Sequence, residues 1–219
     1  MAAAPFVFVL LLSSLLMAGC IEKEEAKEEP EPILRDAYSL YILDRGPFEI
    51  VGPEEPIQRQ FLILGDGPVE ISFGMLRGVH LTSGAIRNDI AMFARESIED
   101  DNWLPGCHRW MLDASEITVD GRWYYFVTLL VRRDPDLTRR LTRIQQVTHA
   151  REIQRLGDNI DYIVRVYYTV KDPDVYILTL SAPPEDLAVM EEDVLRLLAN
   201  IRLSQSEAMS AIGGRQAGE

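Results

Sequence analysis

Cysteine and histidine are scarce in this sequence, with two and three residues among 219. Two cysteines are too few for a framework of several disulfides or for a four-cysteine zinc site. Positive charge is also in deficit, because 22 basic residues stand against 35 acidic ones and the formal net charge is −13. Such an excess of negative charge disfavours attraction to nucleic acid or to an anionic surface, so we expect no nucleic-acid partner.

The sequence motifs of common enzymes are missing as well. There is no Gly-x-Ser-x-Gly elbow, no His-Glu-x-x-His pair and no phosphate-binding P-loop. Cys107 and His108 are neighbours, and adjacent side chains rarely bind one metal ion together. The acidic run 99–101 lacks the spaced oxygen ligands and the glycine of a calcium loop. We therefore expect no metal, no cofactor and no catalytic residue.

The first 20 residues have the pattern of a secretory signal, in which an apolar stretch is followed by small residues. The ending Met17-Ala18-Gly19-Cys20 resembles the lipobox of lipoproteins, and this resemblance implies that Cys20 carries a lipid and begins the mature chain. Two alternatives are an uncleaved signal anchor, because about 20 apolar residues cross a bilayer, and a buried helix of a soluble protein. Lipid and apolar anchor both attach the chain to a membrane.

The rest of the chain divides into three parts. Residues 21–34 predict a flexible acidic tether, since six Glu, two Lys and two Pro within residues 22–32 cannot bury apolar surface. Its acidity favours the extracytoplasmic side, because cytoplasmic flanks are rich in Lys and Arg. Residues 35–203 are the expected folded domain, and the small polar residues of 204–219 predict a disordered tail. With 47% hydrophobic and 26% charged residues, the composition is that of a globular protein.

Alternating and helical patterns predict an α+β fold. Tight turns such as Asp120-Gly121 join neighbouring strands, which must then be antiparallel. Helices expected at 84–99 and from Pro184 onward each have a single apolar stripe that needs a sheet to cover. Segment 135–156 predicts an imperfect helix or a long excursion. The prediction is an αβα sandwich built on an antiparallel β-sheet, with strands at 38–43, 48–51, 59–64, 69–76, 115–119, 122–132, 160–170 and 175–181.

The C-terminal part resembles a known family. Residues 175–183 read Val-Tyr-Ile-Leu-Thr-Leu-Ser-Ala-Pro, and an acidic helix follows that ends in Leu-Leu-Ala-Asn-Ile-Arg-Leu at 197–203. This ending, together with the strand order over 38–203, resembles PsbP/Mog1/DcrB-like domains. The resemblance implies a non-catalytic accessory, assembly or binding protein, because no catalytic residue is common to the family. It also agrees with a lipoprotein, because bacterial members of the family include lipoproteins.

Two segments are candidates for contact with a partner. The expected loop 102–110 has two tryptophans beside Pro-Gly, and Trp and Arg dominate interface hot spots; the alternative is that the tryptophans cover the core. The Arg-rich stretch 132–155 contacts lipid headgroups or an acidic partner, or else it is a solvated helix face balanced by nearby acids. The candidate partner-binding residues are Trp103, His108, Arg109, Trp110, Arg139, Arg140 and Arg143.

The function that these observations favour is that of a membrane-anchored extracytoplasmic lipoprotein, a non-catalytic binding or assembly module with an envelope protein as its unknown partner. One alternative is a carrier that holds a small apolar ligand in a pocket between sheet and helices. The other is an enzyme with a site near His108, assembled with Arg109 and Glu116 from separate loops.

Overall fold

The computed structural model describes residues 32–52, 60–79, 86–99, 104–148 and 160–216. The chain divides into two units, Met1–Pro30 and Glu31–Glu219, and the described strands and helices all belong to the second. The predicted signal and the predicted lipid attachment at Cys20 lie outside the described residues. Among the helices that are described, none combines the length and the apolar character needed to cross a membrane.

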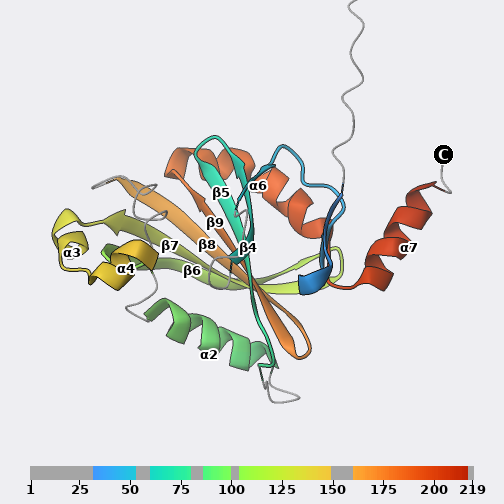
Figure 1. The fold of residues 1–219 in the computed structure, drawn as a ribbon, viewed down its shortest axis with the longest axis horizontal. Helices are drawn as coiled ribbons and strands as arrows, with labels where there is room; N and C mark the ends of the chain where they lie inside the picture. Colours follow the sequence, from blue (N-terminus) through green and yellow to red (C-terminus); the bar gives the residue numbers. More distant parts are fainter. Residues whose placement is uncertain (1–31, 53–59, 80–85, 100–103, 149–159, 217–219) are drawn as a thin grey trace, which may run out of the picture. The chain divides into compact units, whose positions relative to one another are not determined.

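A seven-stranded antiparallel sheet forms the centre of the domain (Figure 1). Three pairs of strands that follow each other along the chain are joined by short turns, at residues 67–68, 120–121 and 172–173, as the sequence predicts. Asp120 and Gly121 both have positive φ, 48° and 73°, which is the backbone of a two-residue hairpin turn. The strand order is β3 (Glu49–Gly52), β4 (Gln60–Asp66), β5 (Val69–Leu76), β9 (Asp174–Ala182), β8 (Asp161–Lys171), β7 (Arg122–Arg133) and β6 (Cys107–Val119).

A second, three-stranded sheet brings the two ends of the domain together. Its order is β1 (Ile33–Arg35), β2 (Leu40–Ile42) and β10 (Ile201–Arg202), with the short 3-10 helix η1 (Asp36–Tyr38) between the first two strands. Ile42 lies opposite Ile33 on one side and Ile201 on the other. The first and the last strands of the domain therefore share one sheet.

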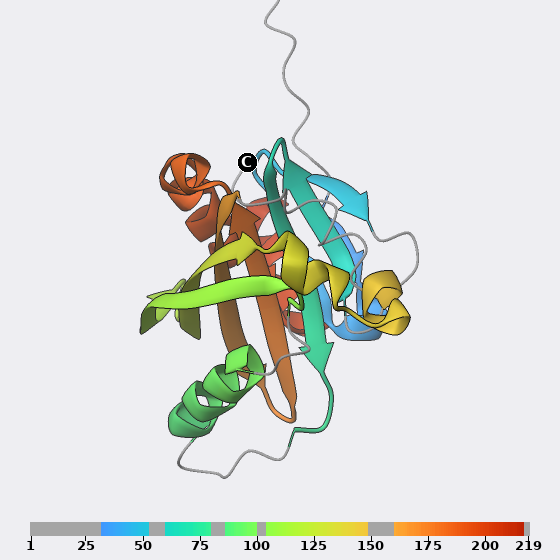
Figure 2. The ribbon, with the colours of Figure 1, turned by 90° about the vertical axis from the view of Figure 1, so that its left-hand side faces the viewer.

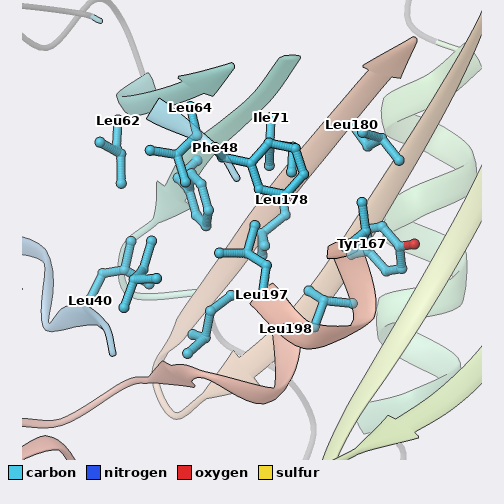
Figure 3. Close-up of a cluster of buried hydrophobic side chains, with 14 of the residues drawn as sticks. Leu40, Phe48, Leu62, Leu64, Ile71, Tyr167, Leu178, Leu180, Leu197 and Leu198 are labelled. Carbon is cyan, nitrogen blue, oxygen red and sulfur yellow. The ribbon is translucent and has the colours of Figure 1, made fainter. Parts of the chain in front are cut away.

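Helix α6 (Pro184–Ala199) and the small sheet cover one face of the central sheet. The apolar stripe of α6 contributes Leu197 and Leu198, which are buried among side chains of β2, β4 and β9 (Figure 3). The hydroxyl of buried Tyr124 donates a hydrogen bond to the carbonyl oxygen of Leu198, 3.2 Å away, so this phenol is satisfied inside the core.

Helix α2 (Ile86–Glu99) covers the opposite face, so that the sheet lies between α6 and α2 (Figure 1). Ile90, Ala94 and Ile98 form its buried stripe, at the helical spacing that the sequence shows. Phe93 packs edge-to-face against Tyr168 of β8, with the ring centroids 6.0 Å apart. The α+β class and the αβα sandwich are thereby confirmed.

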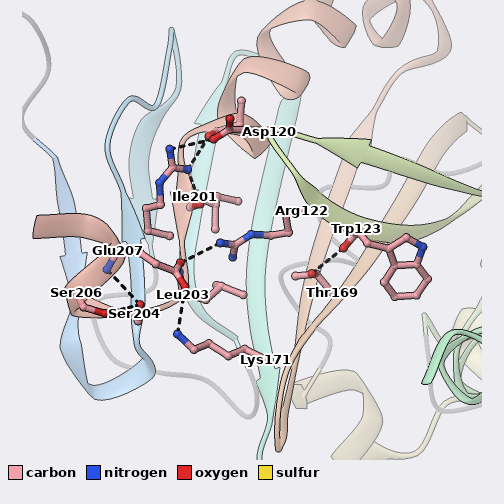
Figure 4. A network of polar contacts seen from close by, with 12 residues as sticks. Asp120, Arg122, Trp123, Thr169, Lys171, Ile201, Leu203, Ser204, Ser206 and Glu207 are labelled. Atoms are coloured by element: carbon pink, nitrogen blue, oxygen red, sulfur yellow. Dashed lines mark hydrogen bonds and ion pairs between the residues drawn. The ribbon is translucent and has the colours of Figure 1, made fainter. Parts of the chain in front are cut away.

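The C-terminal segment differs from the expected disordered tail. Residues Gln205–Gln216 form helix α7, whose Ala208 is buried against Tyr41 and Leu43. The carboxylate of Glu207 accepts hydrogen bonds from the Leu203 amide and from Arg122, at 3.2 and 3.0 Å (Figure 4). Burial alone would raise the pKa of Glu207, but these bonds lower it overall, because they favour the charged form. Contacts with residues distant in the sequence, Tyr41, Leu43 and Arg122, thus stabilise α7, although the composition of this segment does not predict a helix.

Two further boundaries differ from the sequence prediction. Strand β6 begins at Cys107, so the second half of the expected loop 102–110 is strand, while residues 100–103 lie outside the described part. Segment 135–156, where an imperfect helix or a long excursion is expected, contains two short helices, α3 (Pro135–Arg139) and α4 (Arg143–Thr148), and its residues 149–156 lie outside the described part. Asp134 caps the start of α3 with its side chain, and the helix ends at Arg139, with Arg140 as its C-cap.

Candidate partner-binding site

Strand β6 lies at one edge of the central sheet and is the green strand in Figure 2. Within the described ranges, no strand pairs with its outer edge. Trp110, Met111 and Leu112 at its centre are 45%, 47% and 56% exposed. Three consecutive exposed apolar side chains on an open sheet edge are unusual, because an open strand edge invites pairing with another chain.

A β-bulge at Leu112 determines which side chains of β6 share a face. Met111 lies opposite Leu129 and Asp113 opposite Thr128, so Leu112 has no opposite residue in β7. The extra residue shifts the alternation of faces by one position. Met111 therefore projects on the face covered by α2, where Leu129 is buried, and Trp110 projects on the other face.

His108 connects the start of β6 to the Arg-rich stretch. Its Nε2 lies 2.9 Å from Oδ2 of Asp134, and its ring lies 5.7 Å from that of Trp110. The other carboxylate oxygen of Asp134 accepts hydrogen bonds from the amides of Asp136 and Leu137. The amide of Asp136 and then the imidazole of His108 lower the pKa of Asp134, because both favour its charged form. The structure thus joins two candidate regions that are separate in the sequence.

Gly106 fixes the approach of the chain to β6. Its φ is +80°, and a Cβ atom there would lie 2.9 Å from Oγ1 and 3.2 Å from Cα of Thr138 in α3. Its carbonyl oxygen accepts a hydrogen bond of 3.0 Å from the amide of Asp134. The backbone that leads into β6 therefore packs directly against Thr138 of α3, and only glycine fits at position 106.

The arginines of the stretch 132–148 divide into two kinds. Arg132 binds Asp161 through two hydrogen bonds of 2.6 and 2.8 Å, and Arg139 pairs with Asp136 at 2.9 Å. Arg140 and Arg143 are exposed, and no residue in the described part of the chain forms an ion pair with either. Arg132 and Arg139 therefore have the acidic partners that a solvated helix face requires. Arg151 and Arg155 lie outside the described ranges.

The residues of the enzyme alternative do not come together. Eight residues of extended strand separate His108 from Glu116, a span of roughly 25 Å at the rise of a β-strand. The carboxylate of Glu116 accepts a hydrogen bond of 2.9 Å from the indole of Trp123 and pairs with Arg87 at 3.3 Å. The idea of one site that combines His108 with Glu116 is wrong, because both side chains stand far apart on one strand.

Cys107 does not form a nucleophilic pair with His108. Successive residues of a strand point to opposite faces, and Cys107 packs against the cluster under α2. Burial raises the pKa of its thiol to about 11, although Arg133 and Arg109 act in the opposite direction. A thiol with this pKa is protonated at neutral pH and is a poor nucleophile and metal ligand. In the described ranges, no group of three or more His, Cys, Asp or Glu side chains could hold a metal ion.

A groove of about 590 Å³ lies elsewhere, at the hairpin between β4 and β5. The carboxylates of Glu49, Asp66 and Glu70 line it together with Tyr162. Such a lining does not suit a small apolar ligand, whose pocket is mostly apolar. This groove therefore gives no support to the carrier alternative.

Sequence reasoning found only part of this site. His108, Arg109 and Trp110 lie on β6, whereas Trp103 is outside the described residues. Met111, Leu112 and Asp134 were not among the candidates. The signal for the first two was Pro105-Gly106, a turn that precedes a run long enough for a strand.

No protein-family model matches the sequence, and no curated protein is similar to it in sequence. Solved structures with a similar fold include the cyanobacterial PsbP protein of Synechocystis sp. PCC 6803, at 11% identity and a TM-score of 0.49, over 78% of this chain and 90% of that chain. The Ran-binding protein Mog1p of Saccharomyces cerevisiae is similar at 7% identity and a TM-score of 0.46, over 81% and 96% of the two chains. A Pseudomonas aeruginosa protein of unknown function, a putative regulator by its description, is similar at 17% identity and a TM-score of 0.39, over 70% and 95%. These structures belong to the fold that the sequence resembles, and none of them gives a residue of this chain a role.

Proposed function

We propose that the protein is a membrane-tethered, extracytoplasmic binding module without catalytic activity, and that β6 is its docking strand. The observation that carries this proposal is the exposed apolar centre of β6, Trp110 to Leu112, on the open edge of the central sheet. The partner is a protein of the cell envelope that adds an extended segment to this edge.

The physical basis of docking is the set of groups that β6 offers to another strand. Its outward backbone amides and carbonyls can form a further ladder, which provides affinity, while side chains on the two faces provide specificity. Burial of the exposed parts of Trp110, Met111 and Leu112 adds about 25 cal/mol for each Å² of apolar surface removed from water. The bulge and the flanking charges disfavour pairing with arbitrary strands, so β6 accepts a selected partner.

Three contacts support a role without catalysis. The thiol of Cys107 is protonated and packed into the interior, as its raised pKa indicates. The imidazole of His108 is engaged by Asp134, which is itself occupied with capping α3. The carboxylate of Glu116 is engaged by Trp123 and Arg87. Cys107, His108 and Glu116 thus each have a structural contact of their own.

The tether is tested by the replacement Cys20→Ser in the full-length chain. If Cys20 carries a lipid, this change removes its thiol, so we expect complete loss of incorporated labelled fatty acid and accumulation of the unprocessed precursor. Metabolic labelling followed by electrophoresis measures both. The matched control is Cys107→Ser, which leaves the label in place; a native protein without label that stays in the membrane fraction would support the uncleaved anchor instead.

Docking is tested by photocrosslinking in intact membranes of cells that make the protein. A photoreactive amino acid in place of Leu112 is expected to give a discrete crosslinked product, because this side chain lies at the centre of the docking strand. The control position is Met209 of α7, which is 60% exposed and far from β6 in the sequence. Equal and diffuse products from both positions, or none from position 112, would contradict the proposal.

A further inference from the structure

The two halves of β6 carry charges of opposite sign. Arg109 precedes its apolar centre, and Asp113 and Glu116 follow it. When two copies of such a strand pair antiparallel, the basic half of each lies against the acidic half of the other. Opposite charges placed directly across a strand pair stabilise it, and the same patch on both partners is the defining property of a two-fold interface.

The bulge at Leu112 makes this pairing possible for the decisive charges. Arg109 lies opposite Val131 of β7 and Glu116 lies opposite Tyr125, and both of these β7 residues belong to the cluster under α2. Arg109 and Glu116 therefore share one face, although their odd separation would put them on opposite faces of a regular strand. Only residues of the same face can lie opposite each other across a new strand pair.

From this register we propose that the occupant of the docking strand is a second copy of the chain, paired β6 to β6 about a two-fold axis between Leu112 and Asp113. The inference rests on the proposed role of β6 as a docking strand. In this arrangement Arg109 of each copy lies opposite Glu116 of the other, so the ionic contact occurs twice.

The same register places large side chains opposite small ones. Trp110 of one copy faces Ser115 of the other, and Met111 faces Ala114. The exposed apolar side chains of both copies then gather within three residues of the axis, where they leave water together. At the axis, Leu112 of each copy lies opposite Asp113 of the other, and the two ionic pairs lie at the flanks of the contact.

Two electrostatic conditions bear on this contact. The side chain of Glu116 is 46% exposed, so its carboxylate can accept a further cation while it holds Trp123 and Arg87. The net charge of −13 on each chain opposes association. At physiological ionic strength, salt screens interactions between charges more than about 8 Å apart. It therefore weakens this long-range repulsion more than the short ionic contacts at β6. Attachment to one membrane also raises the effective concentration of the copies.

The test exchanges the charges of the ionic contact in the full-length protein. Two differently tagged copies are produced together, solubilised from the membrane, and purified through one tag while the other is quantified. With R109E in both copies, or with E116R in both copies, like charges face each other twice, and we expect co-purification to fall about tenfold or more. With R109E in one copy and E116R in the other, both contacts are again between opposite charges, and we expect co-purification to return to the original level.

The control R77E makes the same change of charge at an exposed position directly after β5, four strands away from β6 in the central sheet, and is expected to leave co-purification unchanged. Thermal unfolding of each variant shows that the domain is folded. Failure of the mixed pair to restore co-purification overturns the inference, as does an original pair that does not co-purify. If the product crosslinked through position 112 then contains a different protein, β6 is still a docking strand and only its pairing with a second copy is excluded. If there is no crosslinked product, the proposed function is wrong as well.

Discussion

Leu197→Ala is expected to lower the free energy of unfolding by about 3–4 kcal/mol, a loss typical of a large side chain removed from a rigid core. Leu197 is fully buried between α6 and the central sheet. Truncation to alanine loses the transfer free energy of the removed methyl groups and leaves a cavity, because the two sheets hold the surrounding side chains in place. Urea unfolding followed by circular dichroism measures the change as a lower midpoint with an unchanged slope.

The matched control is Leu34→Ala in β1. It removes the same atoms from a side chain that is 51% exposed, so we expect a loss of less than about 1 kcal/mol. Equal losses at positions 34 and 197 would mean that α6 does not contribute to a close-packed core, contrary to the burial of its apolar stripe against the sheet.

Gly106→Ala is expected to destabilise the domain by about 2–5 kcal/mol, for two reasons that add. An L-residue at a φ of +80° is strained by about 1–2 kcal/mol. In addition, the new Cβ would lie 2.9 Å from Oγ1 and 3.2 Å from Cα of Thr138, and forcing extra atoms into a packed site costs about 1–3 kcal/mol. The same unfolding experiment measures the sum.

Gly121→Ala separates the two contributions. Gly121 has a similar φ of +73°, but no atom lies within 4 Å of the position that its Cβ would take. We expect this variant to show the strain alone, so its loss of stability is the smaller of the two. If both glycine variants lose the same free energy, the packing of β6 against α3 has no influence on stability.

The parts of the fold that follow from local pattern were predictable. Alternation in 160–170 indicated β8, and Val164, Val166 and Tyr168 are buried on the one face that this alternation predicts. The single stripes of α2 and α6 were equally clear, because each helix buries one side only. Such patterns arise where one face of an element meets the core.

The elements that the sequence did not indicate depend on contacts over long distances. The strand pattern of β6 is weak because an edge strand exposes residues on both faces. Helix α7 is held by Arg122, which is 85 positions away from Glu207. The pairing of His108 with Asp134 joins residues 26 positions apart, and no periodicity signals it. Sequence alone therefore found the residues at the start of β6 but not the side chains that position them.

The three-stranded sheet has a consequence for how the domain is completed during synthesis. Strand β2 is made early, yet one of its two neighbours is β10, and the amide of Leu43 donates to the carbonyl of Asn200, 3.0 Å away. During synthesis the three-stranded sheet therefore cannot form until β10 has been made, near the end of the chain. Pairing between strands so far apart in the sequence is also intrinsically slow. The nascent chain therefore remains incompletely folded until β10 has been synthesised, a state that suits the export that we propose for this protein.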